Sequence, residues 1–208
     1  MLDFDGTVAV GDEPVLTYFR AVAGEEADEA FASWVVAGEG HPDGYSLVAA
    51  WARAHGVAEE ARAAAYAASR AALHSGVVTV AAPVGLADLL GRCPPDVARV
   101  LVTNAPVDGI EPVLERLGLS GRLEALVGDA GKPDGMPDVL AGLLEEADVA
   151  ADRLLSVGDV WVNDLAPAHG IGAATAFIDR FGTGEGDPTF RARTLTGLMP
   201  DVERWWSA

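Results

Sequence analysis

The sequence predicts an α/β protein with a parallel five-stranded sheet, helices on both faces of the sheet, and an all-helical insertion. Two observations support this fold class. From about residue 80 onward, short apolar runs alternate with helix-length segments, which is the pattern of repeated βα units. Between the opening residues and that point, about seventy residues show helical periodicity alone. That stretch is therefore interpreted as a helical domain inserted into the α/β domain.

The first strand is expected at residues 2–5, within the opening sequence MLDFDGTVAV. Because the side chains of an extended chain alternate between two faces, Asp3 and Asp5 point the same way and Phe4 points the other. Two carboxylates at one place raise each other's pKa unless a cation lies between them or one stays protonated. The pair indicates a metal site, an acid, or both. A simple turn is the alternative, since Asp-Gly is a common hairpin sequence.

Four helices are expected in the insertion, over residues 13–23, 26–37, 45–55 and 58–74. The last is rich in alanine, has two glutamates in its first turn, and is followed by Gly76. These are the features that the helix dipole and helix capping favour. We place the insertion at residues 13–77, which leaves residues 1–12 and 78–208 for the sheet domain.

Four more strands are expected, at residues 98–104, 123–129, 153–159 and 173–179, with helices near 84–91, 108–117, 136–147 and 163–169. Residues 182–189, GTGEGDPT, are expected to form a surface loop. The opening strand and the first three of these strands each end in a polar residue. Ligands of parallel sheets bind beyond the carboxyl ends of the strands, so these ends should converge on one site.

Two loops that follow strands carry candidate phosphate-binding residues. Thr103 and Asn104 lie where a strand enters its loop, and a hydroxyl group and backbone N–H groups there could hold phosphate oxygens. Both residue types also form ordinary turns. Lys132 lies in a turn directly before Pro133, where its charge could neutralise a phosphate and screen the carboxylates. An ordinary surface lysine is the alternative.

Two further acids follow the strand expected at 153–159. Asp159 ends that strand, and Asp164 lies five residues further on, near the start of a helix. A helix N-cap would account for one of these acids but not for both. If both lie at the same end of the sheet as Asp3 and Asp5, a Mg²⁺ ion bound through oxygen ligands would neutralise the negative charge of the four acids.

Four segments occur in the order DFDGT, VLVTN, GKP and VGDVWVND. With them, the chain resembles the haloacid dehalogenase-like (HAD) hydrolase superfamily over its whole length. The first and fourth segments are specific motifs, whereas the other two would be weak alone. The resemblance implies a Rossmann-like sheet, and it identifies the helical insertion as the cap domain of these hydrolases.

The resemblance also implies catalytic and phosphate-binding roles. Asp3 matches the nucleophile that forms an aspartyl-phosphate, and Asp5 matches the general acid and base two residues further on. Thr103 and Lys132 match the hydroxyl and the amine that bind phosphate. Asn104, next to Thr103, is expected to bind phosphate with them. Asp5 would protonate the leaving alkoxide and then take a proton from the hydrolytic water.

The resemblance implies a Mg²⁺ ion as well. Its ligands would be the carboxylates of Asp3 and Asp159 and the backbone carbonyl of Asp5, with Asp164 supporting the metal shell. The expected function is a Mg²⁺-dependent phosphatase for a small phosphorylated metabolite. A phosphomutase is the alternative on the same fold; a dehalogenase and a non-catalytic binding module are weaker alternatives.

The formal net charge of −18 argues against nucleic acid or an anionic membrane as a partner. It also means that a phosphate site needs local positive charge from a cation, a lysine or backbone N–H groups. The lone Cys93 cannot form an internal disulfide, and the sequence contains no run that is apolar and long enough to span a bilayer. A cytoplasmic enzyme is expected, and its oligomeric state is left open.

The start of the chain departs from the superfamily's pattern. Only Met1 and Leu2 precede Asp3, whereas similar chains carry several apolar residues there to fill the central strand. The first strand is therefore expected to be either truncated or unusually short.

Overall fold

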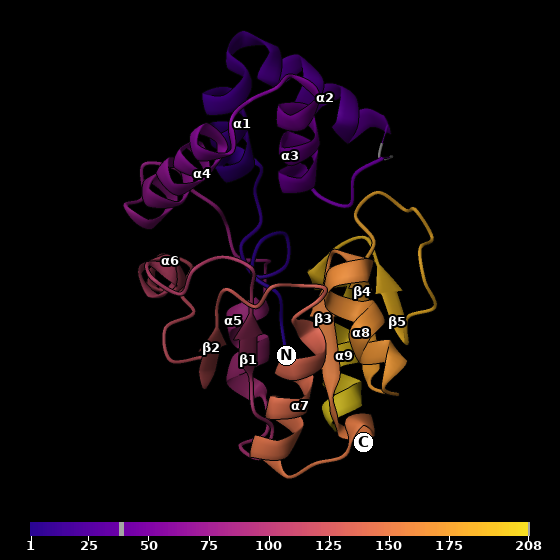
Figure 1. Cartoon of the computed structure of the whole chain (residues 1–208). Helices are drawn as coiled ribbons and strands as arrows, with labels where there is room; N and C mark the ends of the chain where they lie inside the picture. The colour runs from indigo at the N-terminus through magenta and orange to yellow at the C-terminus, as the bar shows by residue number, and fades with distance from the viewer. Residues whose placement is uncertain (38–39, 208) are drawn as a thin grey trace. The chain divides into compact units, whose positions relative to one another are not determined.

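The computed structural model describes residues 1–37 and 40–207, and it divides into two compact units (Figure 1). The sheet unit consists of Met1–Val10 and Ala82–Ala208, and the helical unit is Gly11–Ala81. The sequence placed the corresponding boundaries after residue 12 and after residue 77. Residues 38 and 39 of the expected helical insertion lie outside the described part of the chain.

The sheet unit contains the parallel strands β1 (Val100–Val102), β2 (Ala125–Val127), β3 (Leu155–Gly158), β4 (Ala174–Ile178) and β5 (Phe190–Ala192). β1 pairs with β2, while β4 pairs with both β3 and β5. Leu2 forms parallel bridges to Leu101 of β1 and to Val157 of β3. The opening segment, Met1–Asp3, therefore joins the two groups of strands. The order across the sheet is β2, β1, opening segment, β3, β4, β5.

The opening segment is shorter than the strand expected at residues 2–5. The amide of Asp3 still donates to β3 at 2.9 Å, but three successive amides, those of residues 7–9, donate to the carbonyl of Phe4 at 2.8 to 3.3 Å. This turn bends the chain away from the sheet, so Asp5 pairs back with the turn itself. Competition from these local hydrogen bonds explains why strand pairing stops after the third residue.

Helices cover both faces of the sheet: α5 (Leu86–Arg92), α6 (Ile110–Arg116), α7 (Met136–Ala147), α8 (Ala166–Gly170) and α9 (Leu195–Trp206). Crossovers between parallel strands are right-handed, so connections running toward β2 and toward β4 lie on opposite faces. Because α5 packs with α9 and α7 packs with α8, these two pairs form the two outer layers (Figure 1).

Two of these elements, β5 and α9, were not expected from the sequence. The three residues of β5 have Arg191 at their centre and so offer no apolar run. Helix α9 contains Pro200, a residue that normally ends a helical pattern. The helix expected at 163–169 is α8 preceded by a π-helical turn, η3 (Trp161–Leu165).

The helical unit contains α1 (Glu13–Ala23), α2 (Ala27–Ala37), α3 (Gly44–Ala54) and α4 (Glu59–His74), with bounds close to those expected. Its core is aromatic. Phe19 is fully buried and meets Trp51 edge-on at 5.7 Å between ring centroids, and Tyr18 meets Tyr66 in the same way at 5.6 Å. The buried hydroxyl of Ser69 donates to the carbonyl of Pro14, which ties α4 to α1.

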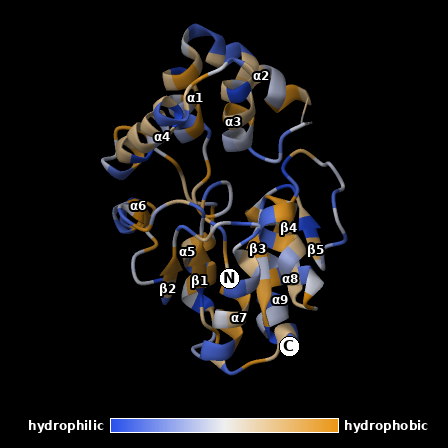
Figure 2. Cartoon of the chain, viewed as in Figure 1, coloured by the Kyte–Doolittle hydropathy of each residue, from blue (hydrophilic) through white to orange (hydrophobic). Residues whose placement is uncertain are grey.

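Apolar residues concentrate on the strands of the sheet unit (Figure 2). One cluster on the α7 and α8 side includes Val102, Met136, Leu140 and Ala168, each almost fully buried. Burial of strand side chains beneath covering helices is expected for a parallel sheet. Among the described helices, none is long and apolar enough to cross a membrane.

Leu101→Ala should destabilise the protein by about 2–5 kcal/mol, because Leu101 is fully buried in β1 and pairs beside Leu2. Val84→Ala is the matched control, since Val84 is 83% exposed and should cost less than about 0.5 kcal/mol. Urea denaturation would measure both. Equal costs for the two variants would contradict the placement of Leu101 in the core.

Candidate active site

The candidate site is built around the side chain of Lys132, which is 8% exposed. Its ammonium group donates to Asp3 Oδ1 at 2.8 Å and to Asp164 Oδ1 at 2.7 Å. Lys132 comes from the loop after β2, Asp3 ends the opening segment, and Asp164 follows β3. The interpretation of Lys132 as an ordinary surface lysine is therefore wrong, because its charge is buried between two carboxylates.

Asn104 holds the backbone of Lys132 from the loop after β1. Its Oδ1 accepts from the Lys132 amide at 2.7 Å, and its Nδ2 donates to the Lys132 carbonyl at 3.2 Å. Both ends of one carboxamide are thus used to position the lysine. The phosphate-binding role that the sequence suggested for Asn104 stays a prediction, whereas the structure places its side chain on the lysine backbone.

Asp164 is 2% exposed and lies within η3. While Oδ1 accepts from Lys132, Oδ2 accepts from the Val160 amide at 3.1 Å, and its backbone carbonyl accepts from Ser156 Oγ at 2.6 Å. The N-cap interpretation of Asp164 is wrong, because Val160 and Leu165 occupy the N-cap positions of η3 and α8. The Asp164 carboxylate therefore contacts the backbone just after β3 and the ammonium group of Lys132.

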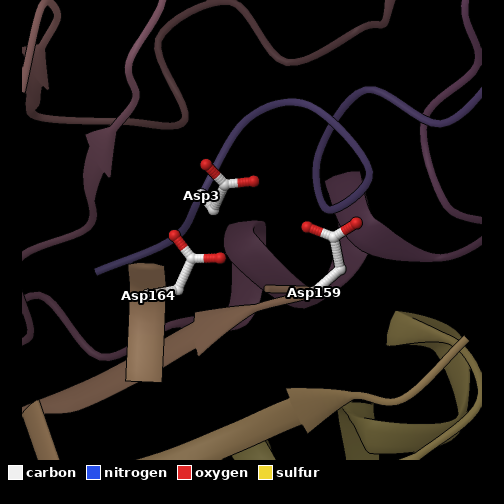
Figure 3. Close-up of side chains that lie close together, drawn as sticks. All are labelled: Asp3, Asp159 and Asp164. Carbon is white, nitrogen blue, oxygen red and sulfur yellow. The ribbon is translucent and has the colours of Figure 1, made fainter. Parts of the chain in front are cut away.

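Asp3, Asp159 and Asp164 form one acidic group, in which each offers a carboxylate oxygen within 4.8 Å of the others. Figure 3 shows the three carboxylates turned toward a common space. Two glycines allow this approach. A Cβ on Gly6 would overlap the Asp159 carboxylate, and a Cβ on Gly158 would overlap the Asp164 side chain.

The electrostatics of this group are unbalanced toward negative charge. Burial, followed by the charge of Asp164, raises the pKa of Asp3 to about 7, although Lys132 opposes the shift. Burial works against the charge of Lys132, but the carboxylates of Asp3 and Asp164 outweigh it and raise the lysine pKa above its ordinary value. One ammonium group thus bonds two carboxylates of a group of three.

Asp5 and Thr103 are the other residues that the sequence assigned to this site. The charge of Asp5 adds to the rise in the pKa of Asp3, which shows that the two acids are close, as their spacing predicted. Thr103 is 2% exposed at the end of β1, and its Oγ1 accepts from the Ala105 amide at 3.0 Å. That bond is the turn-forming interaction that the sequence left open as an alternative.

Sequence reasoning missed Ser156, Gly6 and Gly158 as contributors to the site. Both glycines stand within the two specific motifs, directly beside Asp5 and Asp159, so their positions carried a signal. Ser156 lies inside a buried strand, and its bond to the Asp164 carbonyl depends on the η3 turn. The sequence contains no signal for that bond.

The residues fit a hard divalent cation. Carboxylate oxygens are preferred ligands of Mg²⁺, and the three acids bring such oxygens together around a surplus of negative charge. Asp3 and Asp159 would hold the ion with the backbone carbonyl of Asp5. Asp164, with both its oxygens already bonded within the protein, would support these ligands.

Solved structures with this fold include HAD-type hydrolases. YfnB from Bacillus subtilis, a protein described as a HAD-hydrolase and solved bound to magnesium, shares 17% identity, with 97% of this chain and 96% of that chain covered and a TM-score of 0.68. A protein described as a predicted phosphoglycolate phosphatase from Haemophilus somnus shares 16% identity over the same fractions, with a TM-score of 0.68. A 2-haloacid dehalogenase from Pseudomonas syringae shares 17% identity, with 98% and 97% covered and a TM-score of 0.59.

The chain therefore has the Rossmann-like fold of the HAD-like hydrolases, a fold that serves phosphatases and dehalogenases alike. No family model and no curated protein matches the sequence.

In metal-free protein, the stability contribution of Asp3 should fall as pH rises from about 4 to about 7. The pKa of Asp3 is raised from 3.8 to about 7, so the folded state binds the extra proton across this window. The loss should reach up to about 1.4 kcal/mol per pH unit. Urea denaturation in EDTA should show this decline in the wild type relative to Asp3→Asn. Parallel pH curves for the two proteins would contradict the raised pKa.

Proposed function

We propose that this protein is a Mg²⁺-dependent phosphatase of the HAD-like superfamily that hydrolyses a small phosphorylated metabolite through an aspartyl-phosphate on Asp3. One observation carries the proposal. The Lys132 ammonium group bonds both Asp3 and Asp164, while Asp159 brings a third carboxylate within 4.8 Å. This arrangement supplies a nucleophile, a phosphate-neutralising cation and metal-binding oxygens at one end of the sheet.

In the first step, an oxygen of the Asp3 carboxylate attacks phosphorus, and the bond from phosphorus to the substrate oxygen breaks. Lys132 fixes the orientation of Asp3 and offsets the negative charge of the phosphoryl group. Asp5 gives its proton to the departing alkoxide. Removal of Lys132 would therefore affect both the alignment of the nucleophile and the charge balance.

In the second step, a water molecule attacks the phosphorus of the aspartyl-phosphate. Asp5, now ionised, takes the proton of this water, and the bond between phosphorus and Asp3 breaks. Inorganic phosphate leaves, and Asp3 returns to its carboxylate form. In this proposal, the hydroxyl of Thr103 and the backbone N–H of Asn104, in the loop after β1, help to hold phosphate oxygens.

A bound Mg²⁺ would supply positive charge that offsets the charge of the phosphoryl group during transfer. Asp3, Asp159 and the backbone carbonyl of Asp5 would hold it, with support from Asp164. This local charge matters because the chain has a formal net charge of −18, which repels a phosphate at long range. The helical unit, Gly11–Ala81, corresponds in this proposal to the cap domain that influences substrate choice.

The acidic group favours phosphoryl transfer over dehalogenation. Release of a halide needs neither a general acid at Asp5 nor a metal ligand at Asp159, and both acids lie beside Asp3. A phosphomutase would use the same residues and differ only in the acceptor of the phosphoryl group. We expect no nucleic acid or membrane partner, and we expect the protein to act in the cytoplasm.

A screen of phosphorylated metabolites with Mg²⁺ or with EDTA would test the proposal by measuring released phosphate. We expect release that depends on Mg²⁺ for at least one substrate. Asp3→Asn is the matched control, since it keeps the shape of the side chain but removes the nucleophile, and it should retain no more than a few per cent of the activity. Substantial release in EDTA, or none with any substrate, would refute the proposal.

Asp5→Asn should separate the two steps on nitrophenyl phosphate. Nitrophenolate leaves without a proton, so the first step survives, whereas hydrolysis of the aspartyl-phosphate lacks its base. Rapid-mixing absorbance should show a burst near one equivalent of nitrophenolate per enzyme, followed by a stall. Intact mass spectrometry should then detect the phosphorylated protein. Steady linear release without a phosphorylated intermediate would mean that Asp5 is not the acid and base.

A further inference from the structure

The β4–β5 loop, residues 179–189, begins at the carboxyl end of the sheet, the end at which the acidic group lies (Figure 1). It contains the sequence GTGEG, to which the proposed activity assigns no role. Its glycines, Gly182, Gly184 and Gly186, each have a positive φ of 66° to 70°. Backbone of this conformation favours glycine. The surroundings of Gly184 and Gly186 nevertheless differ, and this difference points to a second reason for glycine at position 186.

An ion pair at the base of the β4–β5 loop fixes its path. The carboxylate of Asp179 is buried, and it accepts from two amides of the loop at 2.8 and 3.1 Å and from the Arg191 guanidinium at 2.9 Å. The same guanidinium donates to the carbonyls of Glu185 and Gly186 at 2.7 and 2.9 Å. Arg191 therefore holds the loop backbone at these two residues.

The part of the loop that Arg191 holds lies against the indole ring of Trp161. A Cβ on Gly186 would overlap this ring, whereas a Cβ on Gly184 would meet no atom within 4 Å. The buried ring of Phe177 meets the indole edge-on, at 5.9 Å between centroids, and the Arg191 guanidinium lies 5.1 Å from the centroid of the Phe177 ring. The indole is therefore restrained by both Gly186 and Phe177.

Trp161 is the first residue of the η3 turn, which positions the acids that follow β3. Its carbonyl accepts from the Ala166 amide, the bond that closes the π-helical turn. The neighbouring Val160 accepts from the Asp164 amide at 2.9 Å and donates to Asp164 Oδ2 at 3.1 Å. Asp159 directly precedes Val160 in the chain. A shift of the indole would therefore move backbone that orients both acids.

We propose that the β4–β5 loop, fixed by Arg191, is a positioning element of the active site that holds η3 through the contact of Gly186 with Trp161. Arg191 and Trp161 are positioning residues, because they act through η3 on the carboxylates of Asp159 and Asp164. The consequence for Mg²⁺ binding rests on the proposed function, whereas the consequence for the η3 turn does not.

Gly186→Ala tests the contact, and Gly184→Ala is its matched control. Both variants place alanine at a positive φ, but only Gly186→Ala pushes a methyl group into Trp161. In metal-free protein, Gly186→Ala should speed hydrogen exchange at the Asp164 and Ala166 amides of η3 by about tenfold or more. It should also weaken Mg²⁺ binding, measured by calorimetry without substrate, by about tenfold or more. Gly184→Ala should produce neither effect.

Two further variants test the route from the loop to the acids. Arg191→Lys keeps the positive charge beside Asp179 but loses the planar fork that holds two carbonyls, so it should change exchange and Mg²⁺ binding in the same direction. It supplies both measurements if Gly186→Ala does not fold. In a Trp161→Leu background, Gly186→Ala should cause little further change, because its methyl group then has space.

Equal effects of Gly186→Ala and Gly184→Ala would overturn the proposal, as would additive effects of Trp161→Leu and Gly186→Ala. Faster exchange with unchanged Mg²⁺ binding would also overturn it, since the loop would then stabilise η3 without positioning the acids. A wild type that binds no Mg²⁺ would instead refute the proposed function. Exchange at η3 would then decide this inference: faster exchange in Gly186→Ala alone would support it, and equal exchange would overturn it.

Discussion

The buried ammonium group of Lys132 is the interaction on which the arrangement of the site depends. It joins the opening segment to the turn after β3 through Asp3 and Asp164, and Asn104 ties its backbone to the loop after β1. A single cation thus links the ends of chain segments that are far apart in the sequence. Removing one partner of such a buried pair leaves an uncompensated charge, at a typical cost of about 3–5 kcal/mol.

Close backbone approach is the second constraint. Gly6 and Gly158 stand where any side chain would overlap the carboxylate of Asp159 or of Asp164. Gly6 also has a positive φ of 84°, which favours glycine in its own right. The acids can converge because the backbone beside them occupies so little space. The convergence in turn creates the surplus of negative charge that a divalent cation would balance.

The opening segment, Met1–Asp3, joins the two groups of strands through very few residues. Its third residue is the proposed nucleophile, and the amino group of its first residue donates to the Leu155 carbonyl of β3. Leu2 alone bridges both neighbouring strands. The position of Asp3 therefore depends on the pairing of Met1, Leu2 and Asp3 with β1 and β3.

The sequence by itself determined the fold class, most of the helices and the choice of candidate acids, because these follow from periodicity and from motif spacing along the chain. It could not show β5 or α9, since Arg191 and Pro200 break the patterns from which strands and helices are recognised. Only the tertiary structure decided that Lys132 is buried and that Asn104 holds its backbone. The physical reason is that charge burial and the pairing of distant loops depend on how the strands are ordered in space. No local pattern around Lys132 encodes the distance of its ammonium group from Asp3, which is 129 residues away in the sequence.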